Sequence, residues 1–92
     1  MFWRRTRPRD RRPAGPRIIF IGRSGCHLCD EAEAVVAAVA EESGVGWVKR
    51  LVDEDPDLLA RWGDQVPVTL VDGQPHDYYR VSAQRLRLAL RR

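Results

Sequence analysis

The chain has 92 residues, which favours a single small domain. About 43% of the residues are hydrophobic and 32% are charged, and no apolar run approaches the roughly 20 residues that span a bilayer. The net charge of +3 is unevenly divided, because residues 1–16 carry six arginines and one aspartate whereas residues 17–92 carry ten basic and twelve acidic residues. The body of the chain is therefore slightly acidic, and it gives no support for a nucleic-acid-binding domain.

Residues 1–16 combine six arginines with three prolines and are predicted to form a disordered basic arm, because they offer too little apolar surface to offset their ordering entropy. A solubilising tail or a start-site artefact is the simplest interpretation. The alternative is that the arm binds nucleic acid or an anionic membrane, and only the arginines indicate such a function. No apolar segment of about 7–15 residues follows these arginines, so we expect a cytoplasmic protein rather than a secreted one. Thiols are normally reduced in that compartment.

The body begins with a short β-branched run at residues 17–22, which predicts a buried strand that ends at Gly22. A helix is predicted from Cys26 to about Ser43, where the Ser43-Gly44 pair ends it. The apolar residues of this helix recur at helical spacing: Ala32, Val35, Val36, Val39 and Ala40. A second strand is predicted at residues 45–52.

A short second helix follows, with Asp55 as its N-cap, Pro56 at its first position and Gly63 at its end. A third strand is predicted at residues 66–71. Asp72-Gly73 is a hairpin turn signal, so that the chain should return antiparallel at about residues 74–80.

The final helix is predicted to start at Ser82, which is a favourable N-cap, and to direct Ala83, Leu86 and Leu90 inward. The order is thus β-α-β-α-β-β-α. A right-handed β-α-β crossover makes the first two strands parallel, and the hairpin adds two antiparallel strands. We therefore predict an α/β domain over residues 17–92, with a mixed four-stranded sheet and three helices packed on its faces.

The two cysteines of the chain, Cys26 and Cys29, form a CxxC motif where the first strand passes into the first helix. Helical periodicity directs Cys29 toward the core, whereas Cys26 lies at or next to the N-cap and faces solvent. Free N–H groups at the helix start, together with the charges of Arg23 and of protonated His27, would stabilise a thiolate at Cys26. We expect Cys26 to attack a substrate disulfide and Cys29 to resolve the mixed disulfide.

Two other uses of the cysteines remain open. The first is plain packing, and the second is a metal or iron–sulfur carrier or adaptor in which the sulfurs are ligands. A structural zinc site usually needs four ligands, and this chain adds only His27 and His76, which is expected to be exposed beside the hairpin. The acidic run at residues 53–57 is most simply a helix start and a solvated loop, although it could bind a cation weakly.

Val66-Pro67 precedes the third strand, and a cis bond there would shape a surface opposite the CxxC. Trp47 and Trp62 are expected to be partly buried. If residues 74–80 form a strand, Tyr78 and Tyr79 point to opposite faces, so that one joins the core and the other borders a substrate groove.

These motifs, R-S-G-C-H-L-C-D-E-A, V-D-E-D-P, V-P-V and D-G, resemble the glutaredoxin-like family of small bacterial proteins with the thioredoxin fold. The resemblance covers residues 17–90. It implies that Cys26 is the nucleophile, Cys29 the resolving thiol and Pro67 a facing cis-proline. It also implies that Val66 offers its backbone to an extended substrate, and that Arg23 meets a glutathione carboxylate.

The resemblance further implies a thiol–disulfide oxidoreductase that needs no resident cofactor. Glutathione is its co-substrate, and glutathione or a reductase is its electron donor, with protein disulfides as the other class of partner. His27-Leu28 differs from the dipeptides usual in glutaredoxins and thioredoxins, yet it would still border the substrate. The glycine pair that grips glutathione in glutaredoxins is replaced here by Tyr78 and Tyr79.

Overall fold

The computed structural model describes residues 15–91, and its elements follow the predicted order with one addition. The elements in chain order are β1 (Ile18–Gly22), α1 (His27–Ser43), β2 (Trp47–Leu51), the 3-10 helix η2 (Val52–Glu54), α2 (Pro56–Trp62), β3 (Val68–Val71), β4 (Gln74–Tyr78) and α3 (Ala83–Leu90). The added element is η2, which takes Val52 out of the predicted second strand. Residues 1–14 of the predicted basic arm lie outside the described residues.

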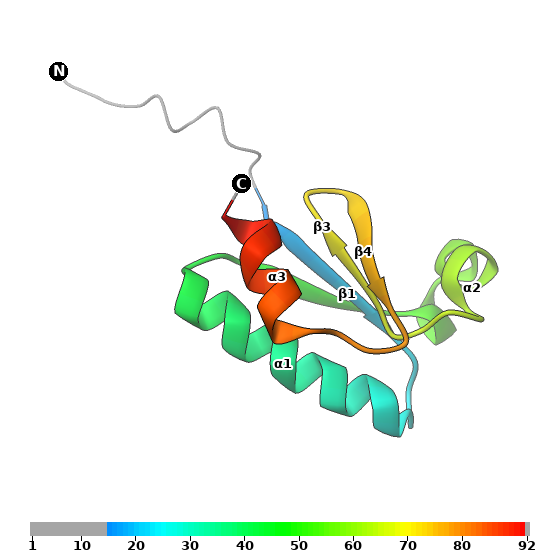
Figure 1. Cartoon of the computed structure of the whole chain (residues 1–92). Coiled ribbons are helices and arrows are strands. Elements are labelled where there is room, and N and C mark those ends of the chain that lie inside the picture. Colours follow the sequence, from blue (N-terminus) through cyan, green and yellow to red (C-terminus); the bar gives the residue numbers. More distant parts are fainter. Residues whose placement is uncertain (1–14, 92) are drawn as a thin grey trace, which may run out of the picture.

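The four strands form one mixed sheet in the order β2-β1-β3-β4 (Figure 1). β1 pairs with β2 in parallel and with β3 antiparallel, and β3 pairs antiparallel with β4. The parallel pair needs a crossover, which α1 supplies. The sheet therefore has the mixed topology that the sequence predicts.

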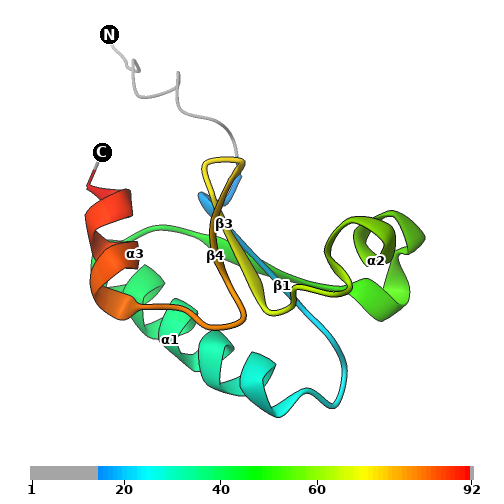
Figure 2. The same cartoon turned by 45° about the vertical axis from the view of Figure 1, so that its right-hand side comes forward.

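Helices cover both faces of the sheet. α1 and α3 lie side by side on one face, whereas α2 lies away from them at the other side of the molecule (Figures 1 and 2). The larger core cluster joins β1 to α1 and α3: Ile18, Phe20, Cys29, Ala32, Val36, Val39, Ala40, Val71, Leu86 and Leu90. The smaller cluster lies on the opposite face: Ile21, Val52, Trp62 and Val68. Period-2 alternation along β1 assigns its residues to the two clusters.

The ends of α1 follow from its sequence. Cys26 is the N-cap and has an extended backbone, and its sulfur accepts a hydrogen bond from the Cys29 N–H. Gly44 ends the helix in the left-handed region at φ 70°, and its N–H donates to the carbonyls of Ala40 and Glu41. The expected start and end of this helix are confirmed.

The hairpin turn is also confirmed, since Asp72 and Gly73 have φ values of 52° and 83°. The strand before the turn begins later than predicted, at Val68 rather than Val66. Pro67 thus precedes the strand, which is consistent with its lack of an N–H for the sheet ladder.

The prediction for the two tyrosines is wrong. β4 ends at Tyr78, and Tyr79 has a φ of 68°, so that the two do not alternate along a strand. Both are exposed, at 39% and 54%, and neither belongs to the core. His76 is half-buried in β4 rather than exposed, whereas Trp62 is buried and Trp47 half-buried, as expected.

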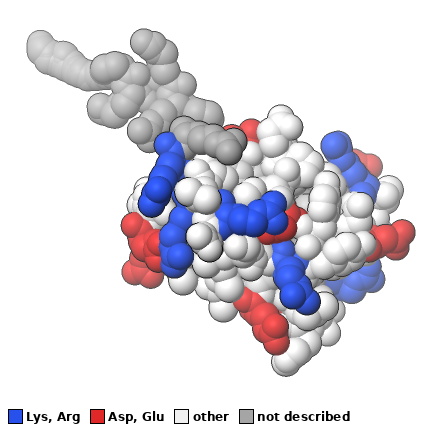
Figure 3. Space-filling view, viewed as in Figure 1, with Lys and Arg blue, Asp and Glu red and all other residues white. Residues whose placement is uncertain are grey.

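Charged side chains are mixed on the surface, and Figure 3 shows both signs interspersed over the face seen in Figure 1. An ion pair of 2.8 Å joins Arg17 before β1 to Asp72 in the hairpin turn, and Arg17 also donates to the Leu90 carbonyl at the end of α3. None of the helices within residues 15–91 is long and apolar enough to cross a membrane.

Candidate active site

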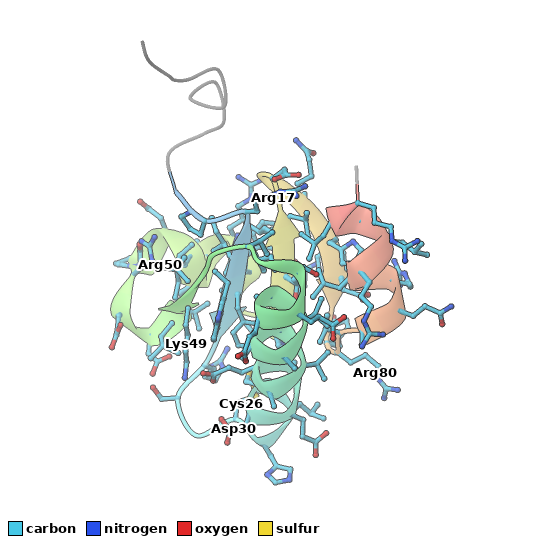
Figure 4. The ribbon with its side chains drawn as sticks, turned by 90° about the vertical axis from the view of Figure 1, so that its left-hand side faces the viewer. Arg17, Cys26, Asp30, Lys49, Arg50 and Arg80 are labelled. Carbon is cyan, nitrogen blue, oxygen red and sulfur yellow. A yellow bond between two sulfur atoms is a disulfide. The ribbon has the colours of Figure 1, made fainter. Side chains whose placement is uncertain are left out.

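The two cysteines meet at the junction between β1 and α1. Cys26 and Cys29 form a disulfide, and their Cα atoms are 5.1 Å apart. Cys26 lies at the end of α1 that is remote from Arg17, and Figure 4 shows Arg80 at this same end of the molecule. The loop that leads to Cys26 includes Gly25, whose φ of 70° favours glycine.

The two sulfurs have different surroundings. Cys29 is 3% exposed and belongs to the larger core cluster, whereas Cys26 is half-buried and packs against the margin of that cluster. The Cys29 N–H donates to the Cys26 sulfur over 3.1 Å. A thiolate at Cys26 in the reduced protein would receive this hydrogen bond and face the positive end of the α1 dipole. A thiolate at Cys29 would be desolvated by apolar neighbours, which disfavours ionisation.

Gly22, the last residue of β1, lies against the buried cysteine. A β-carbon at this position would lie 3.4 Å from Cys29 Cβ, 3.5 Å from Cys29 Sγ and 3.3 Å from the Phe20 ring. Glycine thus lets the first turn of α1 approach the end of the strand. The sequence marks Gly22 only as a strand terminator, because nothing in the chain order shows that Cys29 packs on it.

Val66 and Pro67 lie in the loop before β3, and the peptide bond between them is cis. Val66 packs against the same core cluster as Cys26, and the Pro67 carbonyl accepts a hydrogen bond of 2.7 Å from the Tyr79 N–H. Among residues 15–91, no hydrogen bond engages the N–H or C=O of Val66. These two groups are available to an extended chain that pairs with the loop.

Arg23 is directed toward α2. Its Nη2 donates to the Gly63 carbonyl over 2.6 Å, at the end of that helix. The neighbouring Ser24 N–H donates to Asp53 Oδ1 over 3.3 Å. Hydrogen bonds from the Ser24 side chain and backbone, and then the nearby charge of Arg23, hold the pKa of Asp53 below its ordinary value. These contacts fasten the loop before Cys26 to η2 and α2, a connection that the sequence did not predict.

The two residues inside the motif face solvent. The His27 side chain is 90% exposed, and its Nε2 lies 3.6 Å from a carboxylate oxygen of Glu31, one turn further along α1. Leu28 is 52% exposed, although the next residue, Cys29, is buried. Both side chains are thus accessible to a molecule that approaches the disulfide.

The acidic run has structural roles. Asp55 caps α2 by accepting hydrogen bonds from the N–H groups of Asp57 and Leu58, and Asp53 holds Ser24. In the part of the chain that the structure describes, no three His, Cys, Asp or Glu side chains gather as a metal-ligand group.

The chain is similar to a known family of domains. The family model described as glutaredoxin-like domain (DUF836) matches residues 17–91. Uncharacterised proteins of Mycobacterium bovis and Mycobacterium tuberculosis are 33% identical to the chain over 82 residues, with 84% of each chain covered.

Several solved structures are also similar to the chain in fold. A structural-genomics target protein from X. campestris is 27% identical, with a TM-score of 0.66 over 80% of this chain and 95% of that one. Protein Ne2328 from Nitrosomonas europaea is 24% identical, with a TM-score of 0.64 over 82% and 92%. Thioredoxin 1 from Thermosipho africanus is 15% identical, with a TM-score of 0.60 over 80% and 89%.

Proposed function

The chain belongs to the glutaredoxin-like domain family (DUF836) and has the thioredoxin-like fold, and on this premise we propose that it reduces disulfides by thiol–disulfide exchange. Cys26 is the nucleophile and Cys29 the resolving thiol. The fold and the CxxC pair support a redox function in general. The roles of the individual residues are our inference from their surroundings.

The reaction begins from the dithiol form. The Cys26 thiolate attacks one sulfur of the substrate disulfide, and the other sulfur leaves as a thiolate that takes a proton from water. Cys29 then loses its proton and attacks the Cys26 sulfur, which releases the second substrate sulfur as a thiol. The substrate gains two electrons and two protons, and the protein is left with the Cys26–Cys29 disulfide. Glutathione or a reductase must return the two electrons, and no resident cofactor takes part.

One observation carries the proposal, which is the unequal setting of the two sulfurs. Cys26 caps α1 and is partly accessible, whereas Cys29 is enclosed by the core one turn away. An exchange reaction needs this inequality, because one thiol must meet the substrate and the other must be held close to the first. A pair of thiols that serves only in packing needs no accessible member.

The facing loop supplies a surface for the substrate. The backbone N–H and C=O of Val66 can pair with an extended segment that carries the substrate disulfide, while Pro67 shapes the loop. Leu28 and His27 border the approach to Cys26. We propose both protein disulfides and glutathione disulfide as substrates for this surface, and Arg23 was expected to favour glutathione.

Two single variants test the division of labour. Purified, reduced Cys29→Ser and Cys26→Ser proteins are incubated with glutathione disulfide or a peptide disulfide and examined by non-reducing mass spectrometry. We expect a mixed disulfide on Cys26 in Cys29→Ser, formed at least about tenfold faster than on Cys29 in Cys26→Ser, since the buried thiol is poorly accessible. Equal rates in the two variants, or no adduct on either, would contradict the proposal.

The alternative is a metal or iron–sulfur carrier that uses the same sulfurs as ligands. Anaerobic purification followed by metal analysis separates the two functions. A stoichiometric metal that is lost in Cys26→Ser favours the carrier, whereas rapid disulfide exchange by metal-free protein favours the oxidoreductase.

A further inference from the structure

The loop at residues 23–25, which connects β1 to Cys26, is held at two points by a single neighbouring segment. Arg23 donates to the Gly63 carbonyl over 2.6 Å, and the Ser24 N–H donates to Asp53 over 3.3 Å. Both partners belong to the η2–α2 segment or its end. Gly25 directly follows these two anchors and has a left-handed backbone, so that the loop has a marked bend just before the nucleophile.

The residues that follow α2 also contact Tyr79, which in turn is bonded to the Val66–Pro67 loop. The Tyr79 hydroxyl donates to the Asp64 carbonyl over 3.3 Å, and the Tyr79 N–H donates to the carbonyls of Pro67 and Gln65. Residues 63–65 are therefore bonded to the loop that carries Cys26 and also to the residue that holds the Val66–Pro67 loop. Trp62, immediately before them, is buried in the smaller core cluster and fixes this junction to the sheet.

Charge supports the same arrangement. The positive charge of Arg23 is close enough to Asp53 to help lower the pKa of that carboxylate. The hydrogen bonds of the two side chains go elsewhere: Arg23 donates to Gly63, and Asp53 accepts from Ser24. A guanidinium that donates to a carbonyl at 2.6 Å makes a short, charge-assisted hydrogen bond. The bond uses one of the five N–H donors of the guanidinium and directs the side chain toward the end of α2.

We propose that Arg23 and Asp53 are positioning residues, which hold the Cys26 loop at a fixed separation from the Val66–Pro67 loop by way of η2 and the end of α2. This inference rests on the proposed function, because the separation matters for a substrate that must contact both loops. It is an alternative to the expected role of Arg23 as a ligand for a glutathione carboxylate, and the experiment below separates the two roles. Substrate selection at this site then depends on the two loops themselves rather than on a charge at Arg23.

The test compares paired variants in the full chain. Arg23→Gln removes the donor fork and the charge, whereas Arg23→Lys keeps the charge and one donor group. Asp53→Ala removes the acceptor for Ser24, whereas Asp53→Asn keeps an acceptor oxygen without the charge. Arg91→Gln and Glu54→Gln are charge-matched controls, because both residues are exposed and neither makes a hydrogen bond or an ion pair with the 23–25 loop.

Three quantities are measured for each reduced variant. The first is the rate and KM for 4,4′-dithiodipyridine, a neutral disulfide, and for glutathione disulfide. The second is the pH midpoint of Cys26 alkylation in a Cys29→Ser background. The third is the hydrogen-exchange rate of the Ser24 amide in the oxidised protein, which does not depend on activity.

We expect Arg23→Gln and Asp53→Ala to slow the reduction of both disulfides by a similar factor of about five to ten, as for loss of a charge-assisted hydrogen bond. Arg23→Lys and Asp53→Asn should recover most of this loss. The alkylation midpoint should rise in Arg23→Gln and fall in Asp53→Asn, because the two charges act on the thiolate with opposite signs. The Ser24 amide should exchange faster in Asp53→Ala than in Glu54→Gln.

Two results would overturn the inference. One is an Arg23→Gln protein whose KM rises for glutathione disulfide alone while its rate with dithiodipyridine is unchanged, since Arg23 would then bind substrate. The other is Ser24 exchange that is the same in Asp53→Ala as in Glu54→Gln. If the wild-type protein reduces neither disulfide but the Ser24 exchange and alkylation midpoints shift as expected, the positioning role stands and the proposed function fails.

Discussion

At the scale of single residues, Cys26 and Cys29 have the same side chain, but their positions in the fold give the two sulfurs different exposure and a different tendency to ionise. Cys26 sits at the N-cap of α1, where a backbone N–H donates to its sulfur, whereas Cys29 is 3% exposed among apolar side chains. The first setting stabilises a thiolate and the second disfavours one. The proposed order of attack follows from this difference alone, without any further catalytic group.

Gly22 controls how closely the buried cysteine can approach the sheet. Gly22→Ala would place a methyl group 3.3 Å from the Phe20 ring, which is tighter than ordinary packing, and 3.4–3.5 Å from Cys29, which is ordinary contact. We expect a loss of about 1–2 kcal/mol in the free energy of unfolding, measured with urea, as is typical of an overpacked core. Phe20 and Cys29 share the larger core cluster, so a shift of the Phe20 ring that is passed on to Cys29 should also slow the resolving step.

Gly46→Ala is the matched control for this variant, because its methyl group would lie 3.6 Å or more from the nearest atoms, which belong to Pro16. If Gly22→Ala and Gly46→Ala unfold at the same urea concentration, Gly22 has no packing role against Cys29.

At the scale of elements, short sequence signals correctly predicted where helices start and end and where the hairpin turns. The N-caps Asp55 and Ser82, the terminating Gly44 and the Asp72-Gly73 turn are all found where the sequence places them. Each of these features depends on a hydrogen bond or a φ value within a few residues, so that the residue types at neighbouring positions are enough to predict it. The position of the CxxC at a strand-to-helix junction follows from the same signals.

Contacts between elements were not predictable in this way. The bond from Arg23 to Gly63 joins residues 40 positions apart, and Tyr79 reaches back to Asp64 across the hairpin. Tyr79 itself adopts a φ of 68°, which residue preference does not favour for an aromatic side chain. These groups come together only when the sheet has folded. The sequence therefore did not show that the strand predicted at residues 74–80 ends at Tyr78. It also did not show the bond from Arg23 to Gly63, and the role expected for Arg23 came from a resemblance instead.

At the scale of the whole molecule, several exposed carboxylates connect distant parts of the chain. The pKa of Asp72 is lowered by its hydrogen bonds from Arg17, and that of Glu42 by its hydrogen bond from Arg87, which joins α1 to α3. The pKa of Asp53 is lowered chiefly by Ser24. In each case the carboxylate is more acidic in the folded state than in the unfolded state.

Acid should therefore destabilise the protein in a defined pH range. A lowered folded pKa gives stability that is present above the unfolded values, 3.8 for Asp and 4.5 for Glu, and that is lost as the pH falls through the folded values. We expect the melting temperature to be level from pH 7 to about pH 5 and to fall below about pH 4.5. Circular dichroism melts at intervals of half a pH unit measure this dependence.

In Asp72→Asn the melting temperature should fall less between pH 5 and pH 3 than in the wild-type protein. The free energy of unfolding at pH 7 should change by less than about 1 kcal/mol, because the ion pair with Arg17 is largely solvated. Glu54→Gln is the control, since the Glu54 side chain is exposed and makes no hydrogen bond or ion pair with the other residues of the 15–91 range. A melting temperature that is unchanged from pH 7 to pH 3 would rule out the contribution of these carboxylates.

The most direct measurement of the central claim is the order in which the two thiols of the reduced wild-type protein react. Limiting iodoacetamide is added between pH 6 and pH 9, and peptide mass spectrometry reports the rate at each cysteine. We predict that Cys26 is alkylated at least about tenfold faster than Cys29, with a pH midpoint below the ordinary thiol value of about 8.5. Equal rates, or faster alkylation of Cys29, would contradict the assignment of Cys26 as nucleophile and Cys29 as resolving thiol.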